Sequence, residues 1–231
     1  LASLLPPKRL PLWGLLAFTL ITCAGISLMV GYIDLAPARL LQGALLENDA
    51  VLARILFEIR LPRVALAILV GASLGIAGAA MQGLLRNPLA EPGLLGASSG
   101  AALGAVLALY TGLADQFWLA LPLAGFAGTS LTVALVYLLA GAKTGTTALI
   151  LAGVAISALA SALISLTLNF SPNPHAALEI IFWLMGSLSD RSNREVALII
   201  VPVLLGIGIM LACGTGLRAL ALGEETAYSL G

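Results

Sequence analysis

Long stretches without a charged residue alternate along this chain with short segments that hold its charges. The uncharged runs are 10–33, 64–85, 92–114, 116–142, 144–174 and 196–217. Each reaches the roughly 20 residues that a helix needs to cross the ~30 Å hydrocarbon layer of a bilayer. Alternation at strand spacing is absent, which disfavours a membrane barrel. The pattern predicts an all-α integral membrane protein, a polytopic helical bundle with six transmembrane helices.

Composition agrees with burial in lipid and limits the kinds of partner. Hydrophobic residues make up 60% of the chain and charged residues 10%, which is more apolar surface than a soluble chain of this length could bury. The formal net charge is zero, so nothing indicates a nucleic-acid partner. We expect Cys23 and Cys213 to be small buried hydrophobic residues, and we expect no metal site. Membrane lipid is the first expected partner.

Residues 34–63 differ from the runs on either side because charges interrupt their apolar residues. Arg54 and Glu58 lie four apart, opposite a helical face formed by Val51, Leu52, Ile55, Leu56 and Ile59. This predicts an amphipathic helix at the membrane interface, outside the hydrocarbon. The next spanning helix is expected to follow Pro62, since proline is favoured in a first turn. Residues 176–186 are too short to span and predict a second interfacial piece.

Glycines recur every four residues in two of the predicted spans. Gly71 and Gly75 form a pair, and Gly96, Gly100 and Gly104 form a row of three. Small residues at this spacing fall along one side of a helix and let neighbouring helices approach closely. We therefore expect both sets to lie at helix–helix contacts.

Small polar residues in the fifth predicted span, about 146–169, are candidates for function. Ser157, Ser161 and Ser165 recur every four residues. Such a row either lines a wet route for a polar solute or packs against another helix with its hydroxyls bonded to the backbone. Thr146 and Thr147 are expected to cap the N-terminus of the span.

Two polar segments at the ends of the second predicted span are further candidates. Residues 87–92, which include Asn87 and Leu89, predict a rigid polar turn or a plain connector. Arg60 and Arg63 flank Leu-Pro at the other end. They either reach lipid headgroups or pair with the carboxylates of an acidic partner.

Apparent catalytic motifs lack the context that their chemistry needs. Gly96-Ala-Ser-Ser-Gly100 fits the G-x-S-x-G elbow around Ser98, but an elbow needs a strand-to-helix turn and a nearby base. The single histidine, His175, lies two crossings further along. The segment around Lys143 lacks the glycine that precedes lysine in a phosphate loop. We expect no catalytic residues and no enzyme activity, with an intramembrane serine hydrolase kept as a remote alternative.

A stand-alone channel or facilitator is the other alternative from the residues. No ionisable side chain lies inside a predicted span. Proton-driven carriers usually keep such a group at depth to bind the proton. The pattern therefore argues against a self-contained secondary transporter.

Five segments, in order, resemble successive signatures of one transporter family. They are RLPR at 60–63, MQGLLRNPLAEPGLLGASSGAALG at 81–104, LILAGVA at 149–155, FWLMGS at 182–187 and LALGEETAYSLG at 220–231. Their order and spacing are similar to those in permease subunits of ABC importers for iron-siderophores, haem and vitamin B12. Residues 1–59 agree with that family only in pattern.

The resemblance implies a permease fold of ten helices. Residues 1–231 would form a single domain that holds six of them. The last four helices would be missing, so we expect the chain to be a fragment. Such permeases pair as homodimers or close heterodimers and carry solute between the subunits by alternating access. Two cytoplasmic ATPase subunits would bind ATP and Mg, so this chain would need no cofactor. A periplasmic or lipid-anchored substrate-binding protein would dock outside. The expected solute is an iron-siderophore, haem or cobalamin.

The resemblance also implies an orientation, with the N-terminus in the cytoplasm and the chain in the cell (inner) membrane. Loop charges alone, five positive residues inside against six outside, do not decide it. In that orientation the resemblance puts two arginines where the family meets glutamates of the binding protein, Arg60 and Arg63. Residues 219–231 would be the cytoplasmic coupling segment, with ATPase contacts at Leu220, Leu222, Gly223, Glu224 and Glu225. The cytoplasmic constriction would include Asn87, Leu89, Thr146 and Thr147, and the helix with the serine row would line the pathway.

Overall fold

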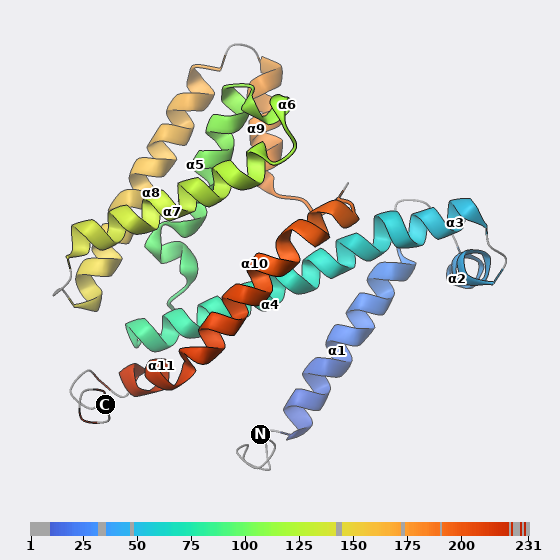
Figure 1. Ribbon diagram of the computed structural model, residues 1–231, viewed down its shortest axis with the longest axis horizontal. Helices are drawn as coiled ribbons and strands as arrows, with labels where there is room; N and C mark the ends of the chain where they lie inside the picture. The colour runs from blue at the N-terminus through green and yellow to red at the C-terminus, as the bar shows by residue number, and fades with distance from the viewer. Residues whose placement is uncertain are drawn as a thin grey trace. The chain divides into compact units, whose positions relative to one another are not determined.

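A computed structural model describes residues 10–31, 36–46, 49–141, 145–171, 174–189 and 191–221, together with 223, 227 and 229. Helices dominate these residues, and none of them forms a strand. The all-α prediction is confirmed. In chain order the elements (Figure 1) are α1 Leu10–Met29, α2 Pro37–Leu45, α3 Ala50–Arg54, the π-helical turn η3 Ile55–Arg60, α4 Leu61–Leu85, the 3-10 turn η4 Pro92–Leu95, α5 Ala97–Tyr110, α6 Leu113–Gln116, α7 Ala120–Ala140, α8 Thr146–Asn169, α9 Pro174–Met185, α10 Asn193–Ala212 and α11 Gly214–Ala221.

The chain divides into two compact units. The first comprises residues 1–72 with 188–205, and the second comprises 73–187 with 206–231. Helices α4 and α10 therefore contribute residues to both units. Each unit has its own internal packing and is described in turn.

Five helices in the described part of the chain are long and apolar enough to cross a membrane. They are Pro11–Met29, Ala50–Leu85, Ala120–Ala140, Thr146–Asn169 and Asn193–Ala212. They correspond to five of the six predicted crossings. The remaining one, predicted over 92–114, is broken by Gly96, whose φ of 77° lies in the left-handed region. The α5 segment that follows has 14 residues and a rise of about 21 Å, less than the hydrocarbon thickness.

The charged segment before Pro62 is continuous with the helix that follows it, contrary to the prediction that a new helix begins at Pro62. Ala50–Leu85 is one continuous helix of 36 residues, about 54 Å long. Proline lacks an N–H and its ring collides with the preceding turn of an ordinary helix. Here the helix widens before Pro62, and Leu61 N–H donates to Leu56 O, five residues back. The π-helical turn thus carries the helix past a proline that was expected to begin it.

The core of the first unit lies where α2 meets the start of this long helix. Leu40, Ala44, Leu52 and Leu56 form a buried cluster. Only Leu52 and Leu56 of the predicted apolar face are fully buried, while Val51 and Ile59 on its edges are exposed. Opposite that face, as predicted, lie Arg54 and Glu58, with Arg54 Nε 3.5 Å from a Glu58 carboxylate oxygen. Such an exposed pair contributes little, but it marks the solvated side.

In the second unit, α5 and α7 pack backbone to backbone. A Cβ placed on Gly100 would lie 2.6 Å from Gly128 O, and one placed on Gly104 would strike Ala124 O. Gly128 has no room for a Cβ either, because Gly100 O occupies the space. Since Gly100 meets Gly128 while Gly104 meets Ala124, the two helices run antiparallel. Small residues at this contact allow the close approach.

Helix α8 runs parallel to α5 in the same unit. A Cβ on Gly153 would strike Leu94 O of the turn before α5, and at the other end Tyr110 Oη donates to Phe170 O at 3.2 Å. The η4–α5 segment thus follows α8 over 17 residues, a rise of about 26 Å. With α7 antiparallel to both, α5, α7 and α8 have the alternating directions of successive crossings. The third predicted crossing is therefore a composite of a 3-10 turn, a left-handed glycine and a short helix.

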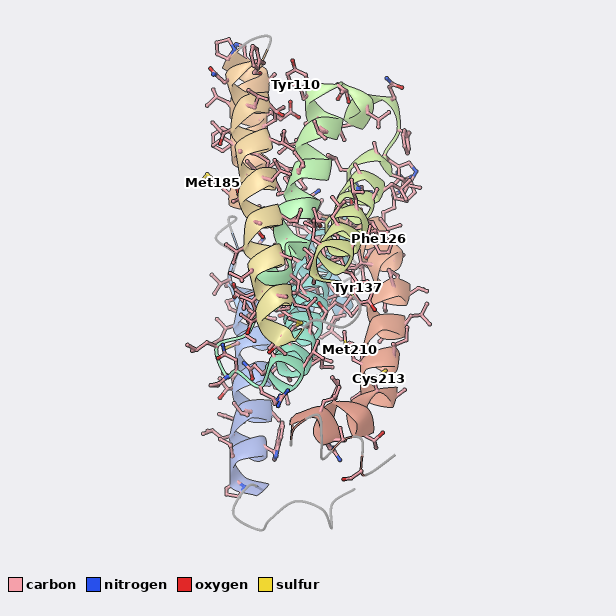
Figure 2. All side chains as sticks on the ribbon, turned by 90° about the vertical axis from the view of Figure 1, so that its left-hand side faces the viewer. Tyr110, Phe126, Tyr137, Met185, Met210 and Cys213 are labelled. Carbon is pink, nitrogen blue, oxygen red and sulfur yellow. The ribbon has the colours of Figure 1, made fainter. Side chains whose placement is uncertain are left out.

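Much of the outer surface of these helices is apolar. Large hydrophobic side chains are exposed on helices of both units, including Phe18, Phe126, Tyr137, Met185 and Leu205. Figure 2 shows the side chains on the ribbon and labels Phe126 and Tyr137 on α7 and Met185 on α9. An exposed apolar surface of this extent is typical of helices that face lipid or further protein. Cys23 and Cys213 are exposed as well, contrary to their expected burial.

Candidate functional site

Arg60 of the RLPR segment is turned into the protein. Its side chain is only 6% exposed, and Nη1 donates to Leu28 O at 2.9 Å and Met29 O at 2.7 Å. The last carbonyls of a helix lack intrahelical donors, and a cation is favourable near a helix C-terminus. Arg60 therefore caps the end of α1. Arg63, one turn further along, is exposed.

The same π-helical turn also binds the start of α10. Asn193 Nδ2 donates to Phe57 O at 3.1 Å. In the i+5 register of this turn the donor for Phe57 O would be the N–H of Pro62, which proline does not have. Asn193 supplies the hydrogen bond that Pro62 cannot. Arg60 of this turn thus donates to carbonyls of α1, and Asn193 of α10 donates to a carbonyl of the turn.

The turn between α4 and η4 is rigid, and it projects one apolar side chain. Asn87 Oδ1 accepts the N–H of Leu89 at 2.9 Å, and Asn87 O accepts that of Ala90 at 3.1 Å. Arg86 takes a φ of 50°, which few non-glycine residues adopt. Ala90 is buried, whereas Leu89 is 84% exposed. A side-chain-locked turn of this kind presents Leu89 outward in a defined position.

The serine row of α8 passes from a packed face to an open one. Ser157 is half-buried beside Gly96, near the buried residues Gly153 and Ile156. Four residues advance a helix by a full turn plus about 40°, so successive serines drift around the axis. Ser161 and Ser165 are exposed, and Ser165 Oγ donates to the carbonyl of Ser161 at 3.0 Å. Packing thus engages the first serine, and the other two face away from the helix contact.

Thr146 and Thr147 do not cap α8, contrary to the prediction. The helix begins at Thr146, and its N-cap residue is Gly145, which makes no side-chain capping hydrogen bond. The two threonines are therefore the first two helical residues. Glycine is an acceptable N-cap, so a threonine was not required there.

The predicted coupling segment is described only in part. Leu220 is half-buried near the end of α11, and Gly223, with a φ of 116°, donates its N–H to Leu220 O. That backbone conformation favours glycine. The remaining predicted contacts lie outside the described residues: Leu222, Glu224 and Glu225. Earlier in α11, Leu217 O lies 3.7 Å from where a Cβ of Gly83 would be, so α11 meets the end of α4.

The G-x-S-x-G motif around Ser98 has no histidine near it to act as its base. Ser98 lies at the start of α5, and Tyr110, bonded to Phe170 O, lies at its end. The separation of twelve positions gives a rise of about 18 Å. His175 follows Phe170 by five residues, at the start of α9, so it lies near the far end of α5 from Ser98. In the described ranges no group of three or more His, Cys, Asp or Glu side chains could hold a metal ion.

Thr132 is a structurally important residue that sequence reasoning missed. It is buried on α7, and its Oγ1 lies 3.0–3.1 Å from the carbonyl oxygens of Gly96, Gly128 and Thr129. Its hydroxyl thus joins α7 to the left-handed residue that precedes α5. No spacing pattern pointed to it, because the contact depends on how closely two helices approach.

The role of Asn193 was also not predicted from the sequence, although a helix-capping motif lies beside it. Ser192 and Glu195 form the S-x-x-E capping box that opens α10, with the Ser192 N–H donating to Glu195 Oε2 at 2.8 Å. The motif predicts where α10 begins. It does not predict that the next side chain, Asn193, binds a carbonyl of a helix far away in the sequence.

Comparison with known proteins identifies the family of this chain. A model of the FecCD transport family matches residues 18–231. The chain belongs to the FecCD transport family. A solved inward-facing structure of a metal-chelate type ABC transporter has the same fold, with a TM-score of 0.82 and 34% sequence identity over 98% of this chain and 68% of that one. The chain is thus a multi-pass helical protein with the fold of ABC transporter permeases.

Similar curated proteins are permeases of several import systems. The molybdate import system permease protein MolB of Haemophilus influenzae is 36% identical, covering 95% of this chain and 66% of MolB. The ferric enterobactin permease protein FepD of Escherichia coli is 36% identical over 94% of this chain and 65% of FepD. The cobalamin permease protein BtuC of Halobacterium salinarum is 39% identical over 75% of this chain and 46% of BtuC. The chain therefore spans about half to two thirds of the length of these relatives.

Proposed function

We propose that this chain works within the permease subunit of an ATP-driven importer of metal chelates, with an iron-siderophore or haem as solute class and cobalamin as the alternative. The observation that carries the proposal is the family match over residues 18–231. The fold shared with a metal-chelate type transporter supports it. Relatives named for ferric enterobactin and for cobalamin support the solute class. Because one relative is named for molybdate, an experiment must include molybdate among the solutes that it tests.

Energy would come from two separate ATPase subunits on the cytoplasmic side, and this chain would be non-catalytic. The ATPases would act on α11 and the coupling segment that follows it. The proximity of Leu217 O to Gly83 supports this route, because movement of α11 would press on the end of α4. Alternating access would follow from rigid helices that shift together at the interface with a second permease subunit, a homodimer in the simplest case.

The solute route would lie along the open face of α8. Ser161 and Ser165 are exposed there, and small hydroxyl side chains suit a hydrated path. Ser157 would mark where the route meets the packed core. On the cytoplasmic side, the rigid turn that projects Leu89, together with Asn87, Thr146 and Thr147, would form the constriction.

The outer surface would receive a substrate-binding protein at Arg63. This proposal assumes an N-terminus in the cytoplasm and insertion in the inner membrane. The exposure of Arg63 supports it, since an accessible guanidinium can pair with a carboxylate in two parallel hydrogen bonds. Arg60, which the resemblance paired with it, is bound inside the protein instead.

Transport in proteoliposomes tests the proposal. The intact permease, its ATPase and the neighbouring binding protein would be reconstituted and offered ferric siderophore, haem, cobalamin and molybdate in turn. We expect ATP-dependent accumulation of one metal chelate or of cobalamin. Uptake that persists without the ATPase would support a channel instead, and labelling of Ser98 by a fluorophosphonate would support a hydrolase.

Coupling has a sharper test in Glu224→Arg. Reversing the charge at the proposed ATPase contact should lower transport-coupled ATP hydrolysis, while basal hydrolysis by the isolated ATPase stays unchanged. The measurement is ATP turnover with and without binding protein and solute. Normal coupled turnover in the variant would rule out Glu224 as a coupling residue.

A further inference from the structure

Two threonine hydroxyls of α7 hold the first turn of α5. Thr129 Oγ1 donates to Ala97 O at 3.0 Å, and Thr132 Oγ1 donates to Gly96 O at 3.1 Å. The acceptors are consecutive carbonyls, and the donors lie three residues apart, nearly one turn of α7. Gly100 leaves room for this contact, because a Cβ there would strike Thr132 Oγ1. We call the two hydroxyls and their two acceptors the threonine clamp.

The clamp is not the usual placement of such side chains. A hydroxyl in a helix commonly bonds to its own backbone. Ser130 and Thr167 do so here, each donating to the carbonyl four residues earlier. Thr129 instead donates to another helix, and Thr132 Oγ1 reaches Gly96 O in addition to two carbonyls of α7.

The clamp holds Gly96 at the point where α5, α7 and α8 meet. A Cβ placed on Gly96 would lie 3.8 Å from Thr132 Cβ on α7 and 3.6 Å from Ser157 Oγ on α8. Two residues earlier, Leu94 O occupies the space beside Gly153 of α8. Hydroxyls that fix Gly96 on α7 therefore also keep the preceding 3-10 turn against α8.

Backbone hydrogen bonds connect this junction to the turn that projects Leu89. Each is 2.8–3.1 Å long, and they join Asn87 to Ala90, Glu91 to Leu94, Gly93 to Gly96 and Gly96 to Gly100. Pro88 and Pro92 fix the φ angle at two further positions of the segment. Leu89 therefore has little freedom to move independently of Gly96.

We propose that Thr129 and Thr132 are positioning residues of the cytoplasmic constriction. By holding Gly96 between α7 and α8, they keep Leu89 at a fixed distance from Thr147 at the start of α8. The two sides of the constriction that this chain contributes then move as one body when the permease changes conformation. The constriction rests on the proposed function, whereas the clamp concerns the fold alone.

The experiment uses the intact permease in nanodiscs and proteoliposomes. Thr129→Val with Thr132→Val removes both hydroxyls while keeping the shape of the side chains, and Thr129→Ser with Thr132→Ser keeps both hydroxyls. Ser130→Ala is the matched control, because the Ser130 hydroxyl donates within α7, to Phe126 O.

Three quantities are measured. Amide hydrogen exchange is followed in peptides covering residues 93–100. The distribution of distances between spin labels at Leu89→Cys and Thr147→Cys is recorded in protein whose exposed Cys23 and Cys213 are replaced by serine, with labelled subunits diluted by unlabelled ones. The ATP-independent leak of an entrapped ferric siderophore is measured in proteoliposomes without the labels.

We expect the valine pair to speed exchange about 25-fold, at about fivefold for each hydrogen bond lost. The distribution of distances between the labels should broaden. Because leak would follow the same released population, it should rise by a similar factor. The serine pair and Ser130→Ala should match the wild-type protein in all three measurements.

Two results would overturn the proposal. One is wild-type exchange in the valine pair, which would mean that the hydroxyls do not hold the start of α5. The other is faster exchange with an unchanged distribution of distances, which would mean that the clamp stabilises α5 without positioning Leu89.

A wrong location for the constriction would give a different result. The valine pair would then broaden the distribution of distances without raising the leak, and the clamp would position Leu89 in a part of the protein that does not close the pathway. If the valine pair does not fold, Thr129→Val and Thr132→Val are measured singly, with about fivefold faster exchange expected for each.

Discussion

Replacing Gly104 with alanine tests the helix contact on which the second unit depends. An added Cβ would strike Ala124 O and lie 2.7 Å from Ala124 C on α7. These are backbone atoms inside a helix, so no side-chain rotation relieves the clash and α5 must move away from α7. Overpacking of this kind costs about 1–3 kcal/mol, and a rigid obstacle places the cost near the top of that range.

The net effect is smaller because alanine favours the helix. That preference returns about 0.5–1 kcal/mol. We expect Gly104→Ala to lower the free energy of unfolding by about 2 kcal/mol, which is about 30-fold in the folding equilibrium. The measurement is unfolding in mixed micelles with increasing SDS, followed by tryptophan fluorescence.

Gly75→Ala is the matched control, since no described atom lies within 4 Å of a Cβ placed there. It should leave stability unchanged or raise it slightly. Ala124→Gly should not rescue Gly104→Ala, because the obstructing atoms belong to the backbone. Equal stability of the Gly104 and Gly75 variants, or rescue by Ala124→Gly, would show that α5 and α7 do not pack as described.

Two further substitutions probe polar contacts that join helices. Thr132→Val removes the hydroxyl near Gly96 O while keeping the shape of the side chain, and should lower the free energy of unfolding in SDS by about 1–2 kcal/mol. A smaller loss of stability in Thr132→Ser would agree with a role of the hydroxyl, and a larger loss would refute it. Asn193→Ala leaves Phe57 O without its donor and should cost about 1 kcal/mol. Adding Pro62→Ala supplies a backbone N–H to that turn, so a double-mutant cycle should show positive coupling, and strict additivity would contradict the register assigned to it.

The predictions that held were those that depend on residues close together in the sequence. Five of the six crossings predicted from the uncharged runs are long helices in the described structure, because a membrane tolerates few charges over a fixed length. Helical spacing placed Arg54 and Glu58 opposite the buried Leu52 and Leu56. These relations follow from the pitch of a single helix and need no knowledge of its neighbours.

The predictions that failed concern features that depend on contacts with other parts of the chain. Such contacts also distinguish residues that have the same spacing in the sequence. Gly75 and Gly104 sit in similar four-residue spacings, yet only Gly104 meets a partner backbone in the described structure. Pro62 was predicted to begin a helix, but the turn before it widens and lets the preceding helix continue. The N-terminus of α8 is capped by Gly145 rather than by either threonine.

The sequence by itself determined that this chain lies in a membrane as helices, and its motifs pointed to the transporter family that the comparison established. Only the tertiary structure decided that Arg60 faces inward to α1 while Arg63 faces outward. Both arginines carry the same charge in the same motif. Their difference arises because the free carbonyls at the end of a helix some 30 residues earlier come within reach of one guanidinium and not the other.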